Sequence, residues 1–188
     1  MAAQGSGPPT GWVVREARPE DAAAGGAIAV RAWEAVHDLR LHLVGAELHE
    51  RLWHDWRVDK AAAVERHVRE RFSDAAVATV GDVRGEAVIW FVTWHYRDAS
   101  RSIAEIGNNA VAPDWQGRGV ATALYGHALS AFRRSGAGVA CVSTGGDPAH
   151  APARRAYQKA GFRIAVPSVT YYLSLHPPQR PGDADPRV

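Results

Sequence analysis

The chain has 188 residues, of which 46% are hydrophobic, and this is enough for one sizeable core. Its 22 basic and 20 acidic residues give a formal net charge of +2 without a long block of one sign, so the composition does not favour a nucleic-acid partner. No apolar run is long enough to cross a bilayer, and the single cysteine, Cys141, cannot form an internal disulfide, so we expect a cytoplasmic protein without a membrane partner.

Both ends of the sequence are poor in large apolar residues. Residues 1–11 contain Gly, Ser and a Pro-Pro pair, and residues 176–188 contain four prolines among charged side chains. Such segments bury too little apolar surface to become ordered. We therefore expect flexible tails at residues 1–11 and 176–188, and one domain at residues 12–175.

The first part of this domain is expected to be a strand followed by helices. Trp12–Ala17 is predicted as a short strand, and Pro19 is well placed to open a helix that reaches about Val36. Within Leu39–Phe72, apolar and aromatic residues recur at three- and four-residue spacing with charges between them. This spacing predicts two helices or one broken helix.

Three strands are expected next. Ala75–Val80 and Ala87–Tyr96 have the composition of strands and are joined by residues 81–86, which have the composition of a hairpin connection. Ser102–Val111 is predicted as a third strand, so an antiparallel meander leads into the stretch DWQGRGVAT at Asp114–Thr122.

The second half of the domain is expected to alternate helices and strands. Apolar residues from Ala121 to Phe132 fall on one helical face, and Gly136 is placed to stop this helix. The remaining elements are expected to be a strand at Val139–Ser143, a loop at Thr144–Ala151, a short helix from Pro152 to Gly161, and strands at Arg163–Val166 and Ser168–Leu175, broken by Pro167.

The stretch at Asp114–Thr122 places two glycines between the end of a strand and the start of a helix. Gly117 and Gly119 keep side chains out of this loop, while the free amides and the positive dipole end of the helix favour an anion such as a pyrophosphate. The plain alternative is that both are turn glycines. Two familiar phosphate loops are excluded by spacing, because neither a Lys followed by Ser or Thr nor a third glycine stands at the required distance.

Residues Gln116–Ala121, QGRGVA, resemble the (Gln/Arg)-x-x-Gly-x-(Gly/Ala) signature of the GNAT superfamily of acyl-CoA-dependent N-acyltransferases. Ala156–Phe162, AYQKAGF, is similar to a later helix motif of that family, Leu-Tyr-x-Lys-x-Gly-Phe. The resemblance covers about residues 12–175 and is strong only after Glu105. It implies an α/β fold in which helices flank a mixed, mostly antiparallel central sheet with a splayed parallel central pair.

The resemblance also implies how acetyl-CoA is held. Amides of the glycine loop would bind the pyrophosphate, and the pantetheine arm would pair with the strand before the loop as an added strand would. His150 stands where many relatives carry an asparagine that bonds the cofactor, and it could keep that contact, act as an acid or base, or only start the helix at Pro152. The residues expected to contact the cofactor are Asn109, Ala110, Val111, Gln116, Gly117, Arg118, Gly119, Val120, Ala121, Thr122 and His150.

Two residues match catalytic positions of the family. Tyr157 matches the general-acid tyrosine that protonates the departing thiolate, with a core aromatic as the alternative. Glu105 lies where some members keep a general-base glutamate, and an even separation puts it on the same strand face as Asn109 and Val111 if no bulge intervenes. The alternative for Glu105 is a polar strand residue or an ion-pair partner. Asn108 and Asn109 could offer amides to the cofactor or acceptor, or satisfy loop backbone.

The acceptor site is less well defined by the sequence. By resemblance, tryptophans of the first half surround the acceptor cleft, where aromatic walls can hold an amine, although most are expected in the core. They are Trp33, Trp53, Trp56, Trp90 and Trp94. Carboxylates in this half are interleaved with Arg and His, so no strongly acidic cleft is expected. The histidines at 37, 42, 49 and 54 lack a compact ligand pattern, so no metal is expected.

We therefore expect an enzyme that transfers acetyl from acetyl-CoA to the primary amine of a small molecule by direct attack in a ternary complex. Neither a lysine nor the cysteine is placed to carry the acyl group. The alternatives are a non-catalytic acyl-CoA-binding or regulatory domain on the same fold, and an acetyltransferase that acts on a protein or peptide amine. A homodimer is left open.

Overall fold

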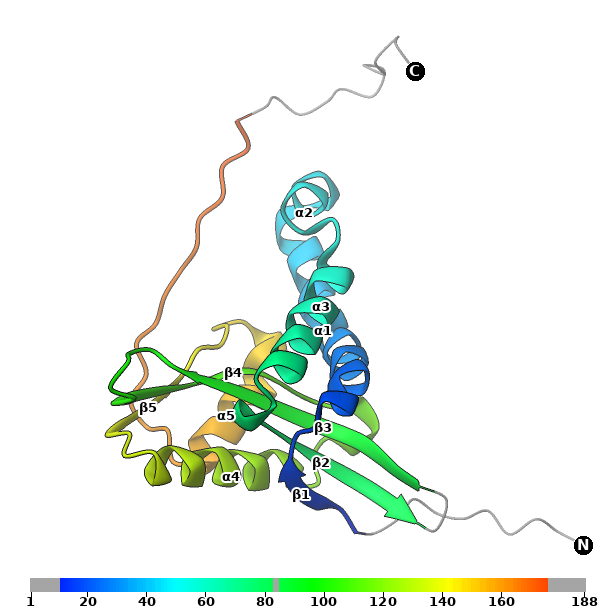
Figure 1. The fold of residues 1–188 in the computed structure, drawn as a ribbon. Helices are drawn as coiled ribbons and strands as arrows, with labels where there is room; N and C mark the ends of the chain where they lie inside the picture. The colour runs from blue at the N-terminus through cyan, green and yellow to red at the C-terminus, as the bar shows by residue number, and fades with distance from the viewer. Residues whose placement is uncertain (1–10, 83–84, 176–188) are drawn as a thin grey trace, which may run out of the picture.

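Five strands form one sheet in the computed structural model, which describes residues 11–82 and 85–175 (Figure 1). Their order across the sheet is β1-β2-β3-β4-β5, in which the first four are antiparallel to their neighbours and β5 is parallel to β4. The strands are β1 Val13–Glu16, β2 Ala75–Asp82, β3 Gly85–Tyr96, β4 Ile103–Val111 and β5 Val139–Val142. The tails expected at residues 1–11 and 176–188, except for residue 11, lie outside the described residues, as do residues 83–84 of the hairpin connection.

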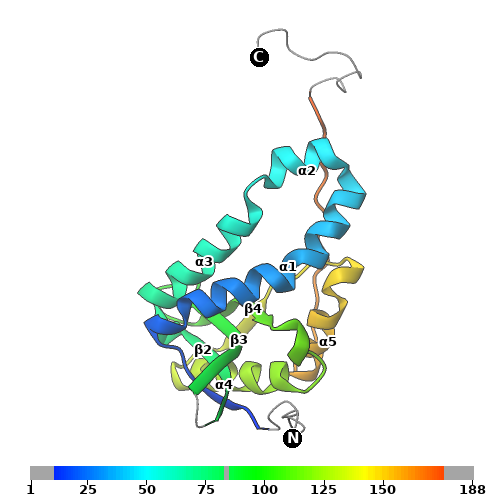
Figure 2. The ribbon, with the colours of Figure 1, turned by 90° about the vertical axis from the view of Figure 1, so that its right-hand side faces the viewer.

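Helices cover both faces of this sheet. They are α1 Ala22–Val44, α2 Ala46–Trp53, α3 Trp56–Glu70, α4 Val120–Arg134 and α5 Ala151–Lys159. Figure 2 shows α1 and α3 above the sheet and α4 below it, while α2 stands away from the sheet at the far end of α1. The expected α/β fold with a mixed sheet between helices is confirmed. Within the described ranges, no helix is long and apolar enough to span a membrane.

Side chains on alternate positions of β3 build the two halves of the core. Trp90, Val92 and Trp94 are all but fully buried on the face that packs against Leu124 and Phe132 of α4. Phe91, between them, points to the opposite face, where the apolar side chains of α1 and α3 gather. Because successive strand residues point to opposite faces, a strand buried on both sides reads as a continuous apolar run, as β3 does.

The first helix is longer than the sequence analysis predicts. It was expected to end near Val36 but continues to Val44, because neither Gly nor Pro interrupts the chain between Val36 and Gly45. Gly45 has a φ of 79°, which favours glycine, and its N–H bonds to the carbonyl of Leu41 at 2.9 Å. The region that follows contains two helices, α2 and α3, which is one of the two arrangements predicted.

The parallel pair β4–β5 separates along its length. Pairing extends only from Ile103 to Ile106 of β4, opposite Val139 to Val142 of β5, whereas β4 continues to Val111. The expected splayed parallel pair is therefore present. The second half of β4 leaves backbone groups facing the gap, which is where an added strand could bind.

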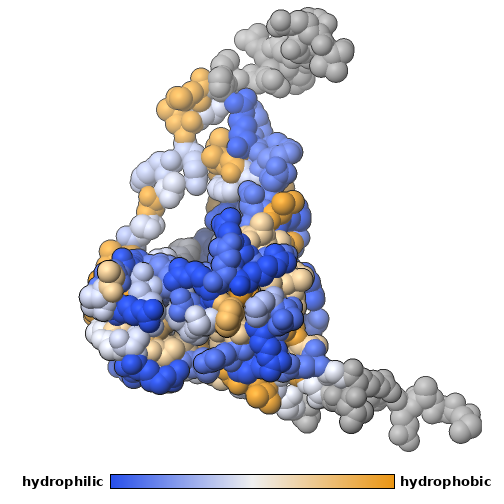
Figure 3. Space-filling view, viewed as in Figure 1, coloured by the Kyte–Doolittle hydropathy of each residue, from blue (hydrophilic) through white to orange (hydrophobic). Residues whose placement is uncertain are grey.

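The two C-terminal strands predicted at Arg163–Val166 and Ser168–Leu175 are absent from the structure. Residues 163–175 are extended but form no strand, and they run away from β5 past α2 (Figure 1). A strand needs a neighbour to complete its ladder of hydrogen bonds, and the β-forming composition of this segment could not show whether the chain supplies one. Figure 3 shows apolar side chains of this segment standing apart from the body of the molecule.

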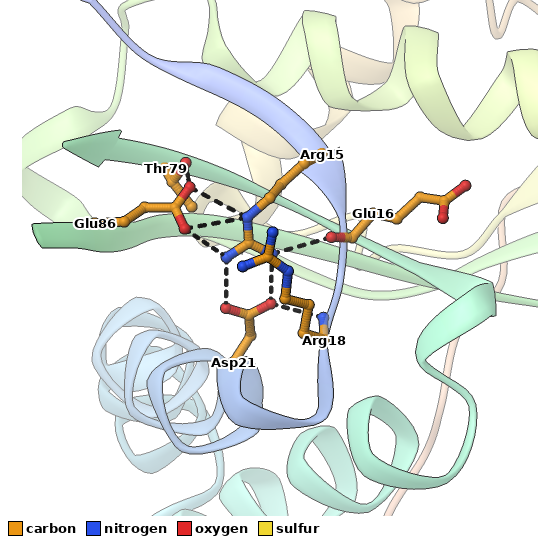
Figure 4. A network of polar contacts seen from close by, with 6 residues as sticks. All are labelled: Arg15, Glu16, Arg18, Asp21, Thr79 and Glu86. Atoms are coloured by element: carbon orange, nitrogen blue, oxygen red, sulfur yellow. Dashed lines mark hydrogen bonds and ion pairs between the residues drawn. The ribbon is translucent and has the colours of Figure 1, made fainter.

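An ion-pair network joins β1 to the turn before α1 and to β3 (Figure 4). Arg15 donates to both carboxylate oxygens of Asp21, at 2.7 and 2.8 Å, and to Glu86 at 3.0 Å. Asp21 also accepts the N–H of Arg18 at 2.7 Å, and Glu86 accepts the hydroxyl of Thr79 at 2.5 Å. The network fixes the direction in which the chain enters α1, the helix that carries part of the site described next.

Candidate active site

One cavity of about 890 Å³ lies between the helices α1 and α3, the second half of β4, the glycine loop and α5. Its volume is within the range of small-molecule sites. The lining residues expected to contact the cofactor are Asn109, Val111, Gln116, Gly117, Gly119, Val120, Ala121, Thr122 and His150, and the catalytic candidate Tyr157 lines it too. Three predicted site residues, Glu105, Ala110 and Arg118, are not among its lining residues.

The glycine loop has the backbone that its sequence predicts. Gly117 and Gly119 have φ values of 77° and 79°, which disfavour any residue with a side chain, and no atom stands within 4 Å of where a Cβ would be. The helix α4 begins directly behind them at Val120, so the amides of Val120 and Ala121 have no acceptor within the helix, whereas that of Thr122 donates to the carbonyl of Gly119 at 3.1 Å. Gln116 ties the loop back to β4 through the carbonyl of Val111, at 3.4 Å.

Arg118 and Ala110 lie differently from their neighbours. The guanidinium of Arg118 lies 4.9 Å from the ring centroid of Trp115. The side chain of Ala110 is buried with Phe91 in the core beneath α1 and α3. A cofactor contact at Ala110 is therefore restricted to its backbone, which is the contact that an added strand makes.

A β-bulge reverses the facing of β4 in the middle of the site. Val92 pairs with Asn109 and Trp94 with Ile106, so Gly107 and Asn108 together oppose the single residue between them on β3. The backbones approach closely at the bulge, because a Cβ on Gly107 would lie 3.0 Å from the hydroxyl of that residue, Thr93, which would have to shift. The bulge sends Asn109 to the α4 face and leaves Asn108 on the face of α1 and α3.

Glu105 is consequently on the opposite face from Asn109, and the expectation that the two share a face is wrong. Glu105 pairs across the strands with His95, and its carboxylate accepts from Arg97 Nε at 2.5 Å and from Ser143 Oγ at 3.4 Å. The hydrogen bond from Arg97 is the main reason that the pKa of Glu105 lies below its usual value, although partial burial opposes it. Ser143 lines the cavity, so Glu105 reaches it through that hydroxyl.

Asn109 joins two tyrosines on the α4 face. Tyr125 of α4 donates its hydroxyl to Asn109 Oδ1 at 2.8 Å, and Asn109 Nδ2 donates to the hydroxyl of Tyr157 of α5 at 3.1 Å. Burial raises the pKa of both phenols, and at Tyr157 it outweighs the opposing hydrogen bonds from Asn109 and Tyr125. Both tyrosines therefore keep their protons at neutral pH, and Tyr157 can donate one.

Tyr125 was not predicted as a site residue. Its position on the apolar face of a helix indicates a core residue, and it is indeed buried. It nevertheless lines the cavity, and its hydroxyl contacts Asn109, sixteen residues earlier in the chain. No local pattern in the sequence carries that information.

His150 precedes α5 and also lines the cavity. Its Nδ1 lies 2.6 Å from Asp147 Oδ2, and its backbone N–H donates to Asp147 Oδ1 at 3.2 Å. Gly145 leaves the space that these two side chains occupy, because a Cβ there would overlap both. The ring of His150 also packs edge-on against Trp33 at 6.1 Å between ring centroids. His150 therefore stands at the start of α5 and also forms part of the wall of the cavity.

Two cationic residues that were not predicted lie on the acceptor side. Lys60 Nζ lies 3.4 Å from the ring centroid of Trp33 and donates to Asn108 Oδ1 at 2.6 Å. Arg40 lies over the same ring at 5.6 Å. Burial, helped by the charge of Arg40, lowers the pKa of Lys60 to about 8. The spacing of apolar residues in this helical region did not mark Lys60, because a lysine between apolar positions is ordinarily solvated.

Of the five tryptophans expected near the acceptor, only Trp33 lines the cavity. Trp90 and Trp94 are core residues beneath α4, and Trp56 is buried against His37 with ring centroids 3.9 Å apart. Nδ1 of His37 also lies 3.3 Å from Nε2 of His49. Burial lowers the pKa of His37 to about 4. Within the described part of the chain, no three His, Cys, Asp or Glu side chains are grouped as metal ligands would be.

Comparison with known proteins adds to this geometry. Residues 45–162 match the model of a family described as Acetyltransferase (GNAT) family. No match to a curated protein sequence was found.

Several solved structures share the fold. A protein from Bacillus halodurans aligns with a TM-score of 0.63 and 14% identity over 86% of this chain and 99% of its own. PaiA N-acetyltransferase from Thermoplasma acidophilum, solved in complex with coenzyme A, aligns with a TM-score of 0.59 and 16% identity over 83% and 92%. YncA from Salmonella typhimurium, solved with acetyl-CoA, aligns with a TM-score of 0.55 and 20% identity over 82% and 81%.

Proposed function

Because this chain belongs to the acetyltransferase (GNAT) family, whose acetyl donor is acetyl-CoA, we propose that it transfers acetyl to the primary amine of a small molecule by direct attack in a ternary complex. The observation that carries this proposal is a single cavity lined by the glycine loop, by Tyr157 and by residues of α1 and α3. The name of PaiA, an N-acetyltransferase with the same fold, supports nitrogen as the accepting atom.

The residues of the loop fit coenzyme A. Two glycines with left-handed φ leave open space at their Cα atoms, and the start of α4 directs free amides to that space. We assign the pyrophosphate to the amides of residues 116–122 and the pantetheine arm to the backbone of residues 109–111. Acetyl-CoA supplies the acetyl group as a reactive thioester.

Tyr157 is the proposed proton donor to the sulfur. Its buried phenol is protonated across the working pH range, and Asn109 and Tyr125 hold its hydroxyl in place. His150 is proposed to contact the cofactor through Nε2, since Asp147 engages Nδ1 and so fixes the orientation of the ring.

Glu105 is the proposed base, acting on the amine through water and the hydroxyl of Ser143. The cavity wall at Ser143 and the 3.4 Å contact between Ser143 Oγ and Glu105 Oε1 support this path. The ion pair with Arg97 keeps Glu105 ionised but also makes it a weaker base. We further propose that the protein works in the cytoplasm without a nucleic-acid partner, given its balanced charge.

The test is release of free thiol from acetyl-CoA across a panel of amines, amino acids, peptides and aminoglycosides, run with the wild type, Tyr157→Phe and Glu105→Gln. Turnover of a small amine that both substitutions reduce, with coenzyme A binding unchanged, is the expected result. Turnover of peptides alone would move the acceptor to the protein or peptide class. Tight coenzyme A binding without turnover of any acceptor would replace the enzyme with a binding or regulatory domain.

A further inference from the structure

The charges that line the cavity are unbalanced on the acceptor side. Arg40 of α1 and Lys60 of α3 both line it beside Trp33. Asp147 is the one carboxylate among its described lining residues, and that carboxylate is already bonded to His150. A free amine approaches such a site as a cation, which Arg40 and Lys60 repel.

Arg40 and Lys60 also lack the salt bridges that other cations of the same helices form. Arg57 and Arg69 of α3 are paired with Glu34 and Glu65, at 2.7 Å each. Neither Arg40 nor Lys60 forms a salt bridge with any described residue, although both are partly buried. A buried cation without a counter-ion is costly, and sites with that property commonly bind a charged ligand.

Resting on the proposed acetyl transfer, we propose that the acceptor is an amine that also carries an anionic group, and that Arg40 and Lys60 bind this anion. A carboxylate or a phosphate bound here would neutralise the two cations, and its negative charge would offset the repulsion of the amine. Trp33, whose ring lies against both cations, would contact the carbon skeleton between the two groups.

The experiment compares acceptors that differ only in the anionic group. Tryptophan is compared with tryptamine, and O-phosphoethanolamine with ethanolamine, so that carboxylate and phosphate are tested separately. We expect kcat/KM to favour the anionic member of at least one pair by about tenfold or more, the usual scale of a charge-assisted bond in a partly buried site. Equal rates within both pairs, or faster transfer to the members that lack the anionic group, would overturn the proposal.

Substitutions of Arg40 and Lys60 test whether these residues cause the preference for the anionic acceptor. Arg40→Gln and Lys60→Met are expected to bring the ratio within the favoured pair close to one, mainly through a higher KM for the anionic acceptor. Arg66→Gln removes the same charge from an exposed position on α3 outside the cavity and is expected to leave the ratio unchanged. A ratio that survives both cavity variants would overturn the assignment.

Failure of the proposed function would remain distinguishable. If no acceptor is acetylated, calorimetric titration of the coenzyme A-bound protein with N-acetylleucine and with N-acetylleucinamide still tests the anion site. Tighter binding of the carboxylate, lost in Lys60→Met, would support the anion site without the reaction. Equal affinities for the two probes would refute it.

Discussion

Asn109 shows how one side chain can set the chemistry of a neighbour. It holds the hydroxyls of Tyr157 and Tyr125 together, while burial keeps both phenols protonated. A tyrosine with a raised pKa is a poor nucleophile but a dependable proton donor at neutral pH. The value of Tyr157 to the reaction therefore depends on residues from three different elements.

Replacing Tyr157 with phenylalanine removes the hydroxyl and leaves the ring in place. We expect kcat to fall by about a hundredfold, the usual scale of a general acid, with coenzyme A affinity changed by less than about threefold. Steady-state kinetics and calorimetric titration with coenzyme A measure the two quantities. Tyr96→Phe, on β3 and outside the cavity, is the matched control. A Tyr157→Phe enzyme with nearly wild-type kcat would remove Tyr157 from the chemistry.

Arg97 should set the pH range over which Glu105, the proposed base, is ionised. Its hydrogen bond lowers the pKa of Glu105, and a base is active only while ionised, so activity is lost as pH falls through that pKa. Arg97→Gln should raise the pKa of Glu105 and thus move the acidic limb of the kcat profile to higher pH. Arg101→Gln removes a nearby exposed charge as the control. An acidic limb that stays in place in Arg97→Gln would exclude Glu105 as the base.

The glycines at the two ends of α4 share the same left-handed backbone conformation. Gly119 and Gly136 flank α4 with φ values of 79° and 83°, and each has open space at its Cα. The two glycines therefore carry the same backbone strain when substituted, about 1 kcal/mol for a non-glycine residue. They differ in that Gly119 lines the cavity.

Alanine at either position isolates that difference. Both Gly119→Ala and Gly136→Ala should lower stability to a similar extent, but only Gly119→Ala should weaken coenzyme A binding, by about tenfold or more, because its methyl group enters the space assigned to the pyrophosphate. Urea unfolding and calorimetric titration measure the two effects. Equal losses of affinity in both variants would show that strain, and not the site, is responsible.

The network around Arg15 predicts a dependence of stability on pH. Asp21 is nearly buried, so Asp21→Asn should destabilise the protein by about 3 kcal/mol at pH 7, whereas the more exposed Glu86→Gln should cost less than about 1 kcal/mol. Burial opposes ionisation of Asp21, but Arg15 and the N–H of Arg18 outweigh it and lower its pKa, while Arg15 and Thr79 lower that of Glu86 to about 2.

The sign of that dependence follows from the lowered pKa values. The stabilisation is fully present above the ordinary carboxylate values near 4 and is lost as pH falls through the folded values. Urea unfolding at steps from pH 7 to pH 3 should therefore show the difference between wild type and Asp21→Asn shrinking towards the acid end. A difference that is constant over this range would assign the effect of Asp21→Asn to packing.

Local patterns predicted most elements and the glycine loop, since helix periodicity, a stop glycine and a loop with two glycines all depend on near neighbours. The bulge at Gly107–Asn108 depends on a close approach to Thr93 on another strand, and the pairing of Lys60 with Trp33 depends on how α1 and α3 pack. Such long-range contacts decided which face Glu105 occupies and which charges reach the cavity. The sequence analysis could not place them.

For the whole molecule, the cavity joins parts that are far apart in the chain. Residues of α1 and α3 form one side, and β4, α4 and α5 form the rest. The helices before β2 and the motifs after β4 therefore form the walls of one cavity. Binding should stabilise the folded chain as one unit.

Thermal unfolding with coenzyme A tests whether the chain unfolds as one cooperative unit. At about 100 times its Kd, a ligand that binds only the folded state adds about 2.7 kcal/mol, which raises Tm by roughly 5–10 °C for a chain of this size. One cooperative transition should shift as a whole. Free pantetheine lacks the pyrophosphate and should raise Tm much less. Two separate transitions, of which only one responds, would show that the two sides of the cavity unfold independently.

The single extra residue at Gly107–Asn108 gives two neighbours in the chain separate tasks. Asn108 bonds to Lys60 among the helices of the acceptor side, and Asn109 bonds to the two tyrosines on the other face. The residues proposed to bind the acceptor and the proposed proton donor are thereby placed on opposite faces of the sheet by one β-bulge. On this arrangement, substitutions in α1 to α3 would change the acceptor preference without altering the contacts of Tyr157.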